Sequence, residues 1–203
     1  MPRRVLLATN NAHKVGEYRR LLDGVPYEVV TPADVALDLD VEEDGETYAE
    51  NATRKAVAFA RASGLLCLAD DSGLEVFALG GEPGVRSSRF AGPGATDADR
   101  IALVLERLRR VPGVSRAARF VCVIAIARPT GELELVEGEC RGEIAAAARG
   151  SHGFGYDPVF LVPEAGVTMA ELPPEEKHRV SHRGRAAAKA REVLARLAME
   201  GPT

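Results

Sequence analysis

The 203-residue sequence contains no glutamine and no tryptophan, and only three asparagines. It also lacks any apolar run near the roughly 18 residues that a membrane-spanning helix requires, and its early apolar run, residues 5–8, is too short for a signal peptide. The net charge of −4 gives no support to nucleic-acid binding. These absences predict a cytoplasmic protein that has neither a membrane nor a nucleic acid as a partner.

Cysteine is also scarce. Cys67, Cys122 and Cys140 are scattered along the chain and lack the spacing of a disulfide framework or a metal site. Cys67 and Cys122 lie inside apolar runs, so we expect them to be buried and reduced. The length is sufficient for one hydrophobic core, and we expect a single domain over residues 1–203.

One stretch combines a buried strand with two adjacent carboxylates. Residues 65–69 are mostly apolar, Asp70 and Asp71 follow directly, and Ser72-Gly73 is a turn signal before a second apolar run. This pattern predicts two carboxylates on one loop at a sheet edge, where they would suit Mg²⁺. The alternative is a solvated turn in which Asp70 caps local structure.

A second polar segment follows the first predicted strand, residues 5–8. Thr9, Asn10, Asn11 and Lys14 stand where that strand passes into an amphipathic helix. A helix N-terminus offers backbone N–H groups and a positive dipole end to a phosphate, and Lys14 adds a charge. The alternative is an ordinary N-cap made by Asn10 or Asn11.

The segment from residue 34 to residue 46 is strongly acidic. It is either a solvated loop or a source of one carboxylate, Glu42 or Glu43, that shares a cation with Asp71. Thr47 and Glu50 then form a capping box for a helix to about residue 62. Asn51 and Lys55 lie four residues apart and therefore share one face of that helix.

Two further segments carry unusual chemistry. In residues 150–158 glycines flank Phe154, whose ring could stack on a base or anchor a core, and Asp157 could accept a hydrogen bond from a base. Residues 175–185 contain four Lys or Arg side chains and two histidines before the last helix, with Ser181 as the expected N-cap. They form either a wall of donors for a ligand or a solvated charged segment.

Six motifs occur in order along the chain: Thr9-Asn10-x-x-x-Lys14, Glu50-Asn51-Ala52, Ala69-Asp70-Asp71-Ser72-Gly73-Leu74, Leu79-Gly80-Gly81-x-Pro83-Gly84, Gly153-Phe154-Gly155-Tyr156-Asp157-Pro158 and Ser181-His182-Arg183. In these motifs the chain resembles the inosine triphosphate pyrophosphatase family from about residue 5 to residue 197. The resemblance implies an α/β fold, a mixed twisted sheet flanked by helices, in two lobes with the nucleotide in the cleft between them. It also implies a homodimer, Mg²⁺ as cofactor, and hydrolysis of ITP, dITP or XTP to the monophosphate and pyrophosphate.

The resemblance also assigns roles to residues. Asp71 would be the general base and a metal ligand, Lys55 would be a second catalytic residue near the triphosphate, and Glu42 would be the other metal carboxylate, with Glu43 as the alternative. The triphosphate would be held by Thr9, Asn10, Asn11, Ala12, His13, Lys14 and Ser72. The base and nearby groups would be held by Phe154, Gly155, Tyr156, Asp157, Lys177, His182 and Arg183.

Base selection has a physical basis in this assignment. Donors such as Arg183 would pair with a 6-oxo group and leave the amino group of adenine facing another donor, and such sites discriminate strongly. Guanine also carries a 6-oxo group, so rejection of GTP depends on the 2-position, for which the sequence indicates no residue.

Two other functions stay open: a pyrophosphatase for modified pyrimidine or methylated nucleotides, and a non-catalytic nucleotide sensor. A phosphatase with an aspartate nucleophile is disfavoured, because the second Asp two residues further on is missing.

Overall fold

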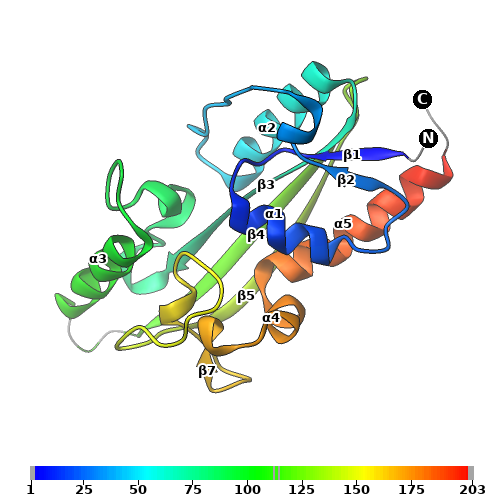
Figure 1. Ribbon diagram of the computed structural model, residues 1–203. Helices are drawn as coiled ribbons and strands as arrows, with labels where there is room; N and C mark the ends of the chain where they lie inside the picture. Colours follow the sequence, from blue (N-terminus) through cyan, green and yellow to red (C-terminus); the bar gives the residue numbers. More distant parts are fainter. Residues whose placement is uncertain (1–2, 112, 114, 201–203) are drawn as a thin grey trace. The chain divides into compact units, whose positions relative to one another are not determined.

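The computed structural model describes residues 3–111, 113 and 115–200 (Figure 1). A mixed seven-stranded sheet has the strand order β2-β1-β3-β4-β5-β6-β7. The strands are β1 (Arg4–Leu7), β2 (Glu28–Val30), β3 (Leu66–Val76), β4 (Ala117–Ala127), β5 (Leu133–Ile144), β6 (Phe160–Val162) and β7 (Val167–Thr168). The α-helices are α1 (Ala12–Leu21), α2 (Tyr48–Ser63), α3 (Asp97–Arg109), α4 (Pro174–Val180) and α5 (His182–Met199). This is the predicted fold class, a mixed sheet flanked by helices.

The described residues fall into two compact units. The first draws on residues 3–71, 122–138 and 184–200, and the second on residues 72–111, 113, 115–121 and 139–183. The strands β3, β4 and β5 each contribute residues to both units. The predicted cleft between two lobes, and the single domain over residues 1–203, stay predictions.

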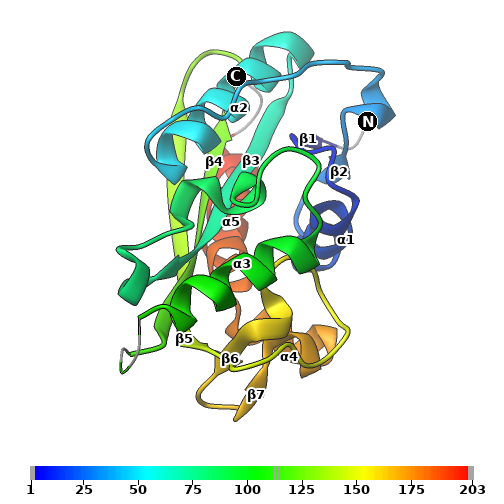
Figure 2. The same ribbon diagram turned by 90° about the vertical axis from the view of Figure 1, so that its left-hand side faces the viewer.

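In the first unit, β1 pairs in parallel with β2 and with β3. Helices α1 and α5 cover one face of this part of the sheet, and α2 covers the other (Figures 1 and 2). The core between the sheet and helices α1 and α5 includes Leu7, Tyr18, Leu68, Ile124 and Leu194, all of which are buried. Along these strands, residues that face α1 and α5 alternate with residues that face α2. Helices therefore cover both faces of the parallel part of the sheet.

In the second unit, β5 pairs antiparallel with β6, and β6 with β7. The apolar stripe of α3, which includes Ile101, Val104 and Leu108, packs in one core with Phe120 and Phe160. The rings of Phe120 and Phe160 lie 4.5 Å apart between centroids. This core supports the loop from Gly150 to Pro158, because Tyr156 and Val159 belong to it.

The predicted start of α2 after Thr47 is confirmed, and α3 begins in a similar way. Thr47 and Glu50 form a reciprocal capping box at the start of α2, and Gly64 ends that helix in the left-handed conformation. Thr96 caps α3 in the same way, with Asp99 as its partner. Each of these contacts joins residues at most four positions apart, so the sequence pattern alone contains the information.

One prediction of local structure is wrong. The turn at Ser72-Gly73 is absent, because β3 continues to Val76, where Leu74 and Val76 pack into the second core and favour an extended chain over the turn. The charged segment before the last helix contains a short helix that the sequence analysis does not include, α4, whose first position is Pro174, a residue suited to a helix start.

The remaining general predictions concern membranes and thiols. Among the described residues, no helix has the length and apolar character needed to cross a membrane. Cys67, Cys122 and Cys140 are buried thiols, as expected for Cys67 and Cys122.

Candidate active site

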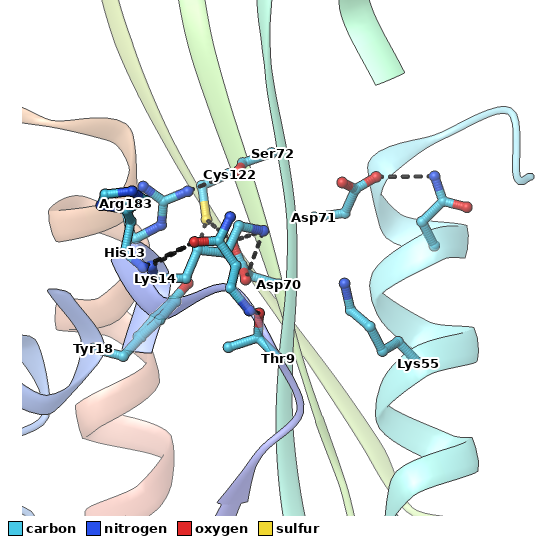
Figure 3. Close-up of polar contacts among 12 residues, drawn as sticks. Thr9, His13, Lys14, Tyr18, Lys55, Asp70, Asp71, Ser72, Cys122 and Arg183 are labelled. Atoms are coloured by element: carbon cyan, nitrogen blue, oxygen red, sulfur yellow. Dashed lines mark hydrogen bonds and ion pairs between the residues drawn. The ribbon is translucent and has the colours of Figure 1, made fainter. Parts of the chain in front are cut away.

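The two adjacent aspartates lie on opposite sides of β3 (Figure 3). The prediction that both carboxylates share one loop is therefore wrong, because successive side chains of an unbroken strand point to opposite faces. The side chain of Asp70 is completely buried, and both its oxygens lie 3.0 Å from the Lys14 ammonium. The Cys122 thiol lies 3.9 Å from the same carboxylate, and the Tyr18 hydroxyl lies 3.7 Å from that sulfur. Asp70 thus holds Lys14 at the start of α1.

Asp71 points toward α2. Its Oδ2 accepts a 2.9 Å hydrogen bond from Nδ2 of Asn51. Burial raises the pKa of Asp71, and this effect outweighs the lowering that the hydrogen bond from Asn51 causes. The like charge of Glu43 raises the pKa of Asp71 further, while Lys14 and Lys55 lower it. A carboxyl group whose pKa lies above its ordinary value is a typical feature of a general base.

Lys55 connects the face of α2 to the acidic segment. Its Nζ donates a 2.6 Å hydrogen bond to Oε1 of Glu43, whereas Glu42 is exposed. Burial alone would lower the pKa of Lys55, but attraction to Asp70, Glu43 and Asp71 outweighs burial and raises it. The ammonium therefore stays charged on the same side of β3 as Asp71.

The segment from Thr9 to Lys14 joins β1 to α1. Asn11 is the N-cap, and its Oδ1 accepts hydrogen bonds from the N–H groups of His13 and Lys14, at 2.9 and 3.2 Å. The N–H of Asn11 donates to Oγ1 of Thr9 at 3.2 Å. The capping alternative is therefore realised, and a phosphate would have to replace the Asn11 side chain as acceptor. Asn10, Asn11, Ala12 and His13 are exposed, so the segment is accessible to such a ligand.

In the second unit, the glycine-rich loop is fixed by one buried ion pair. Lys177 Nζ lies 2.6 Å from Oδ2 of Asp157, and the same oxygen accepts the N–H of Phe154 at 2.9 Å. A Cβ at Gly153 would stand 2.1 Å from this oxygen and 2.8 Å from the Lys177 ammonium. Only glycine fits there, so the loop closes directly over the ion pair.

The loop has further supports on its other side. The N–H of Gly155 donates to Oδ2 of Asp97 at 2.6 Å, and the Tyr156 hydroxyl donates to the backbone oxygen of Ser87 at 2.9 Å. The loop is therefore tied to the start of α3 and to the segment that follows β3. These contacts position the backbone that carries Phe154.

The second unit also gathers cationic groups around Phe154. The Lys177 ammonium and the Arg183 guanidinium each lie 5.3 Å from the centroid of the Phe154 ring. Arg183 donates a 2.9 Å hydrogen bond to Oγ of Ser72, and His182 stacks on Phe120 at 4.5 Å. The structure therefore brings together Ser72, Phe154, Lys177 and Arg183, while His182 packs against the core.

A divalent cation would require oxygen ligands, and the first unit supplies some of them. Among residues 3–111, 113 and 115–200, no group of three or more His, Cys, Asp or Glu side chains is close enough to form a metal site by itself. Asp71 and Glu43 are nevertheless close enough for the charge of Glu43 to raise the pKa of Asp71, and Lys55 supplies a positive charge beside Glu43. Two carboxylates with phosphate oxygens suit Mg²⁺, so these residues fit such a cofactor.

Two contacts at this site were not predicted. Asp70 was expected beside Asp71, not as the partner of Lys14, and Asn51 was noted only as a neighbour of Lys55 on α2. The i, i+4 relation of Asn51 and Lys55 was the available signal. The contact of Asn51 with Asp71 spans 20 positions, and no local pattern encodes it.

Comparison with known proteins adds independent information. A Desulforamulus reducens protein named dITP/XTP pyrophosphatase is 51% identical over 194 residues, which cover 96% of this chain and 96% of that protein. A Thermus thermophilus protein of the same name is 53% identical over 183 residues, which cover 90% of this chain and 87% of that protein. The resemblance inferred from the six motifs is confirmed by these relatives.

Solved structures agree with the sequence matches. A HAM1 protein from Coxiella burnetii has a TM-score of 0.88 and 43% identity, covering 96% of this chain and 99% of that chain. The Ham1 protein of Staphylococcus aureus has a TM-score of 0.85 and 41% identity, covering 95% and 98%. The sequence model of the Ham1 family matches residues 5–193. The chain therefore belongs to the Ham1 family.

Proposed function

We propose that this protein hydrolyses the non-canonical purine nucleotides dITP, XTP and ITP to the monophosphate and pyrophosphate. The observation that carries the proposal is Asp71, a buried carboxylate with a raised pKa, flanked by Lys55 and by the acidic segment. The names of the Desulforamulus and Thermus relatives support the same activity.

Asp71 would accept a proton from the attacking water. A base with a raised pKa is a better proton acceptor while its carboxylate form still exists near neutral pH. The hydrogen bond from Asn51 to Oδ2 fixes the orientation of the carboxylate. A base held in one orientation supports Asp71 as the group that orients the water for attack on the α-phosphate.

Positive side chains would stabilise the charge on the phosphates. Lys55 has its pKa raised and stays charged, and Lys14 is held by Asp70 at the start of α1. Fixed charges of this kind stabilise a transition state without reorganising during the reaction. The exposed residues of the segment from Asn10 to His13, together with Thr9 and Ser72, would contact the triphosphate.

Mg²⁺, when bound, would neutralise phosphate charge and polarise the phosphoryl oxygens. Asp71 and one residue of the acidic segment would hold it. Glu43 fits this role better than Glu42, because Glu43 contacts Lys55 and influences Asp71, whereas Glu42 is exposed.

The base would be recognised by the residues around Phe154. The ring offers a face for stacking, and Lys177 and Arg183, which both lie over that ring, supply donors for a 6-oxo group. The buried His182, stacked on Phe120, would take part only through its neighbour Arg183. Asp157 supports this arrangement by holding Lys177 and the N–H of Phe154. Gly155 and Tyr156 complete the loop. Adenine would place its amino group against these donors and would bind poorly.

Product analysis tests the proposal. The protein is incubated with Mg²⁺ and each of dITP, XTP, ITP, ATP and GTP, and the nucleotide and phosphate products are separated. We expect pyrophosphate and the monophosphate from the first three substrates, with ATP and GTP nearly unchanged. Turnover of modified pyrimidine nucleotides alone, binding without turnover, or orthophosphate as first product would each contradict the proposal. Light scattering on the same sample tests the homodimer that the family resemblance implies.

A further inference from the structure

Asn51 is a buried side chain that donates a hydrogen bond to Asp71 and takes no part itself in the proposed chemistry. We propose that Asn51 is a positioning residue, whose amide holds Asp71 and the acidic segment that carries Glu43 in one arrangement. The inference rests on the proposed function, since it concerns the orientation of the proposed base.

The amide of Asn51 contacts two separate parts of the chain. Its Nδ2 donates to Oδ2 of Asp71 at 2.9 Å, and its Oδ1 accepts the N–H of Gly45 at 2.8 Å. The residue is only 1% exposed. The amide nitrogen therefore binds strand β3, and the amide oxygen binds the acidic segment.

The approach of the acidic segment to Asn51 depends on Gly45. A Cβ at that position would stand 2.7 Å from Oδ1 of Asn51 and 3.0 Å from Cβ of Glu50. The backbone can therefore come this close only without a side chain. Glu43 lies two residues before Gly45, and its carboxylate contacts Lys55, one turn after Asn51 on the same face of α2. Asn51 thus fixes the backbone from which Glu43 reaches Lys55.

Only an amide meets both demands. Asp71 requires a donor and the N–H of Gly45 requires an acceptor, and asparagine has one of each at the end of a short side chain. An aspartate at position 51 would keep the acceptor for Gly45 but would place a second carboxylate against Asp71. An alanine would leave both contacts unmade in a buried place.

Glu50 supplies a matched control, because it anchors the same segment without contacting Asp71. Its Oε2 accepts the N–H of Glu46 at 2.8 Å and that of Thr47 at 3.3 Å. Glu50→Ala therefore loosens the attachment of the acidic segment to α2 and leaves the contact between Asn51 and Asp71 in place.

The kinetic experiment measures kcat and KM for dITP or XTP with Asn51→Asp, Asn51→Ala and Glu50→Ala. A displaced reacting group costs on the order of 100-fold in rate, so we expect both Asn51 variants to lose about 100-fold in kcat with KM within about threefold. Glu50→Ala should keep kcat within about threefold of the parent. A kcat near that of the parent in Asn51→Asp, or an equal loss in Glu50→Ala, would overturn the proposal.

A second measurement needs no activity. The thermal midpoint of Asn51→Asp should fall below that of the parent, because two carboxylates then face each other. Adding Asp71→Asn should raise the midpoint again, since the new amide can donate to the new carboxylate, while activity stays lost. A double variant no more stable than Asn51→Asp would contradict direct contact.

The two proposals fail in different ways. If Asp71→Asn alone keeps full activity, Asp71 is not the base and the proposed mechanism is wrong. If Asp71→Asn is inactive and the Asn51 variants have normal kcat, only the positioning role of Asn51 is wrong.

Discussion

Asp70 and Asp71 are neighbours in sequence with the same side chain, yet the two sides of β3 give them different surroundings. Asp70 is fully buried and ion-paired with Lys14 at 3.0 Å. Asp71 accepts from a neutral amide, and burial, aided by the like charge of Glu43, raises its pKa. One carboxylate is thus neutralised by a fixed cation, while the other is kept as a base. A strand achieves this separation in one residue, because its side chains alternate between faces.

The largest expected effect follows from removing the base. Asp71→Asn keeps the acceptor for Asn51 but cannot take a proton, so we expect kcat for dITP or XTP to fall about 10³-fold or more. Steady-state kinetics measures this loss. Asp44→Asn, an exposed aspartate of the acidic segment, is the matched control and should retain kcat. Equal rates in Asp71→Asn and Asp44→Asn would show that Asp71 is not the base, and would contradict the proposed difference in role between Asp71 and Asp70.

The next largest effect concerns the cation on the Asp71 side. Lys55→Met preserves much of the side-chain volume but removes the charge beside Glu43 and Asp71, so we expect kcat to fall about 100-fold. Kinetics at saturating substrate measures the change. Lys189→Met removes an exposed lysine whose Nζ donates to the backbone of Glu137, and it should leave kcat unchanged. A change confined to KM would instead indicate that Lys55 only binds substrate.

The cation on the Asp70 side should matter more for stability. Lys14→Met removes the ammonium that contacts both oxygens of the fully buried Asp70, and breaking a buried ion pair in this way typically costs about 3–5 kcal/mol in the free energy of unfolding. Lys55→Met should cost about 1 kcal/mol or less, because its partner Glu43 is 37% exposed and can be solvated. Urea unfolding of both variants gives the two values. A greater loss of stability in Lys55→Met than in Lys14→Met would contradict the proposed difference between the two lysines.

The smallest expected effect concerns the reactivity of the buried thiols on the two faces of the sheet. Cys67 and Cys122 are both 0% exposed, and burial raises the pKa of Cys67 to about 12. The thiolate is the reactive form, so we expect neither cysteine to react with a thiol reagent in the native protein at pH 8. Titration in denaturant should then reveal all three cysteines. Rapid reaction of one native thiol would indicate that its side of β3 opens to solvent.

The sequence predicted those features that depend on neighbours along the chain. The capping box at Thr47 joins residues three positions apart, so the sequence pattern alone predicts it. The turn at Ser72-Gly73 was predicted from equally local signals and is wrong, because packing of Leu74 and Val76 in a distant core decides that backbone. Local preference is a weak guide where burial favours another conformation.

The candidate site likewise combines features that follow from neighbouring residues with features that depend on distant ones. The types of residue were predictable, since carboxylates, lysines and a glycine-rich loop each have a chemical signature. Their partners were not predictable, because Lys14 meets Asp70 across 56 positions and Lys177 meets Asp157 across 20. The choice between Glu42 and Glu43 likewise depends on which side chain reaches Lys55, a matter of three-dimensional packing.

The most direct test of the account follows the oxygen of water. The protein is incubated with Mg²⁺ and XTP or dITP in ¹⁸O-labelled water, and both products are analysed by mass spectrometry. Attack of an Asp71-activated water on the α-phosphate predicts the label in the monophosphate and unlabelled pyrophosphate. Label in the pyrophosphate would mean that water attacks the β-phosphate, and it would contradict the account.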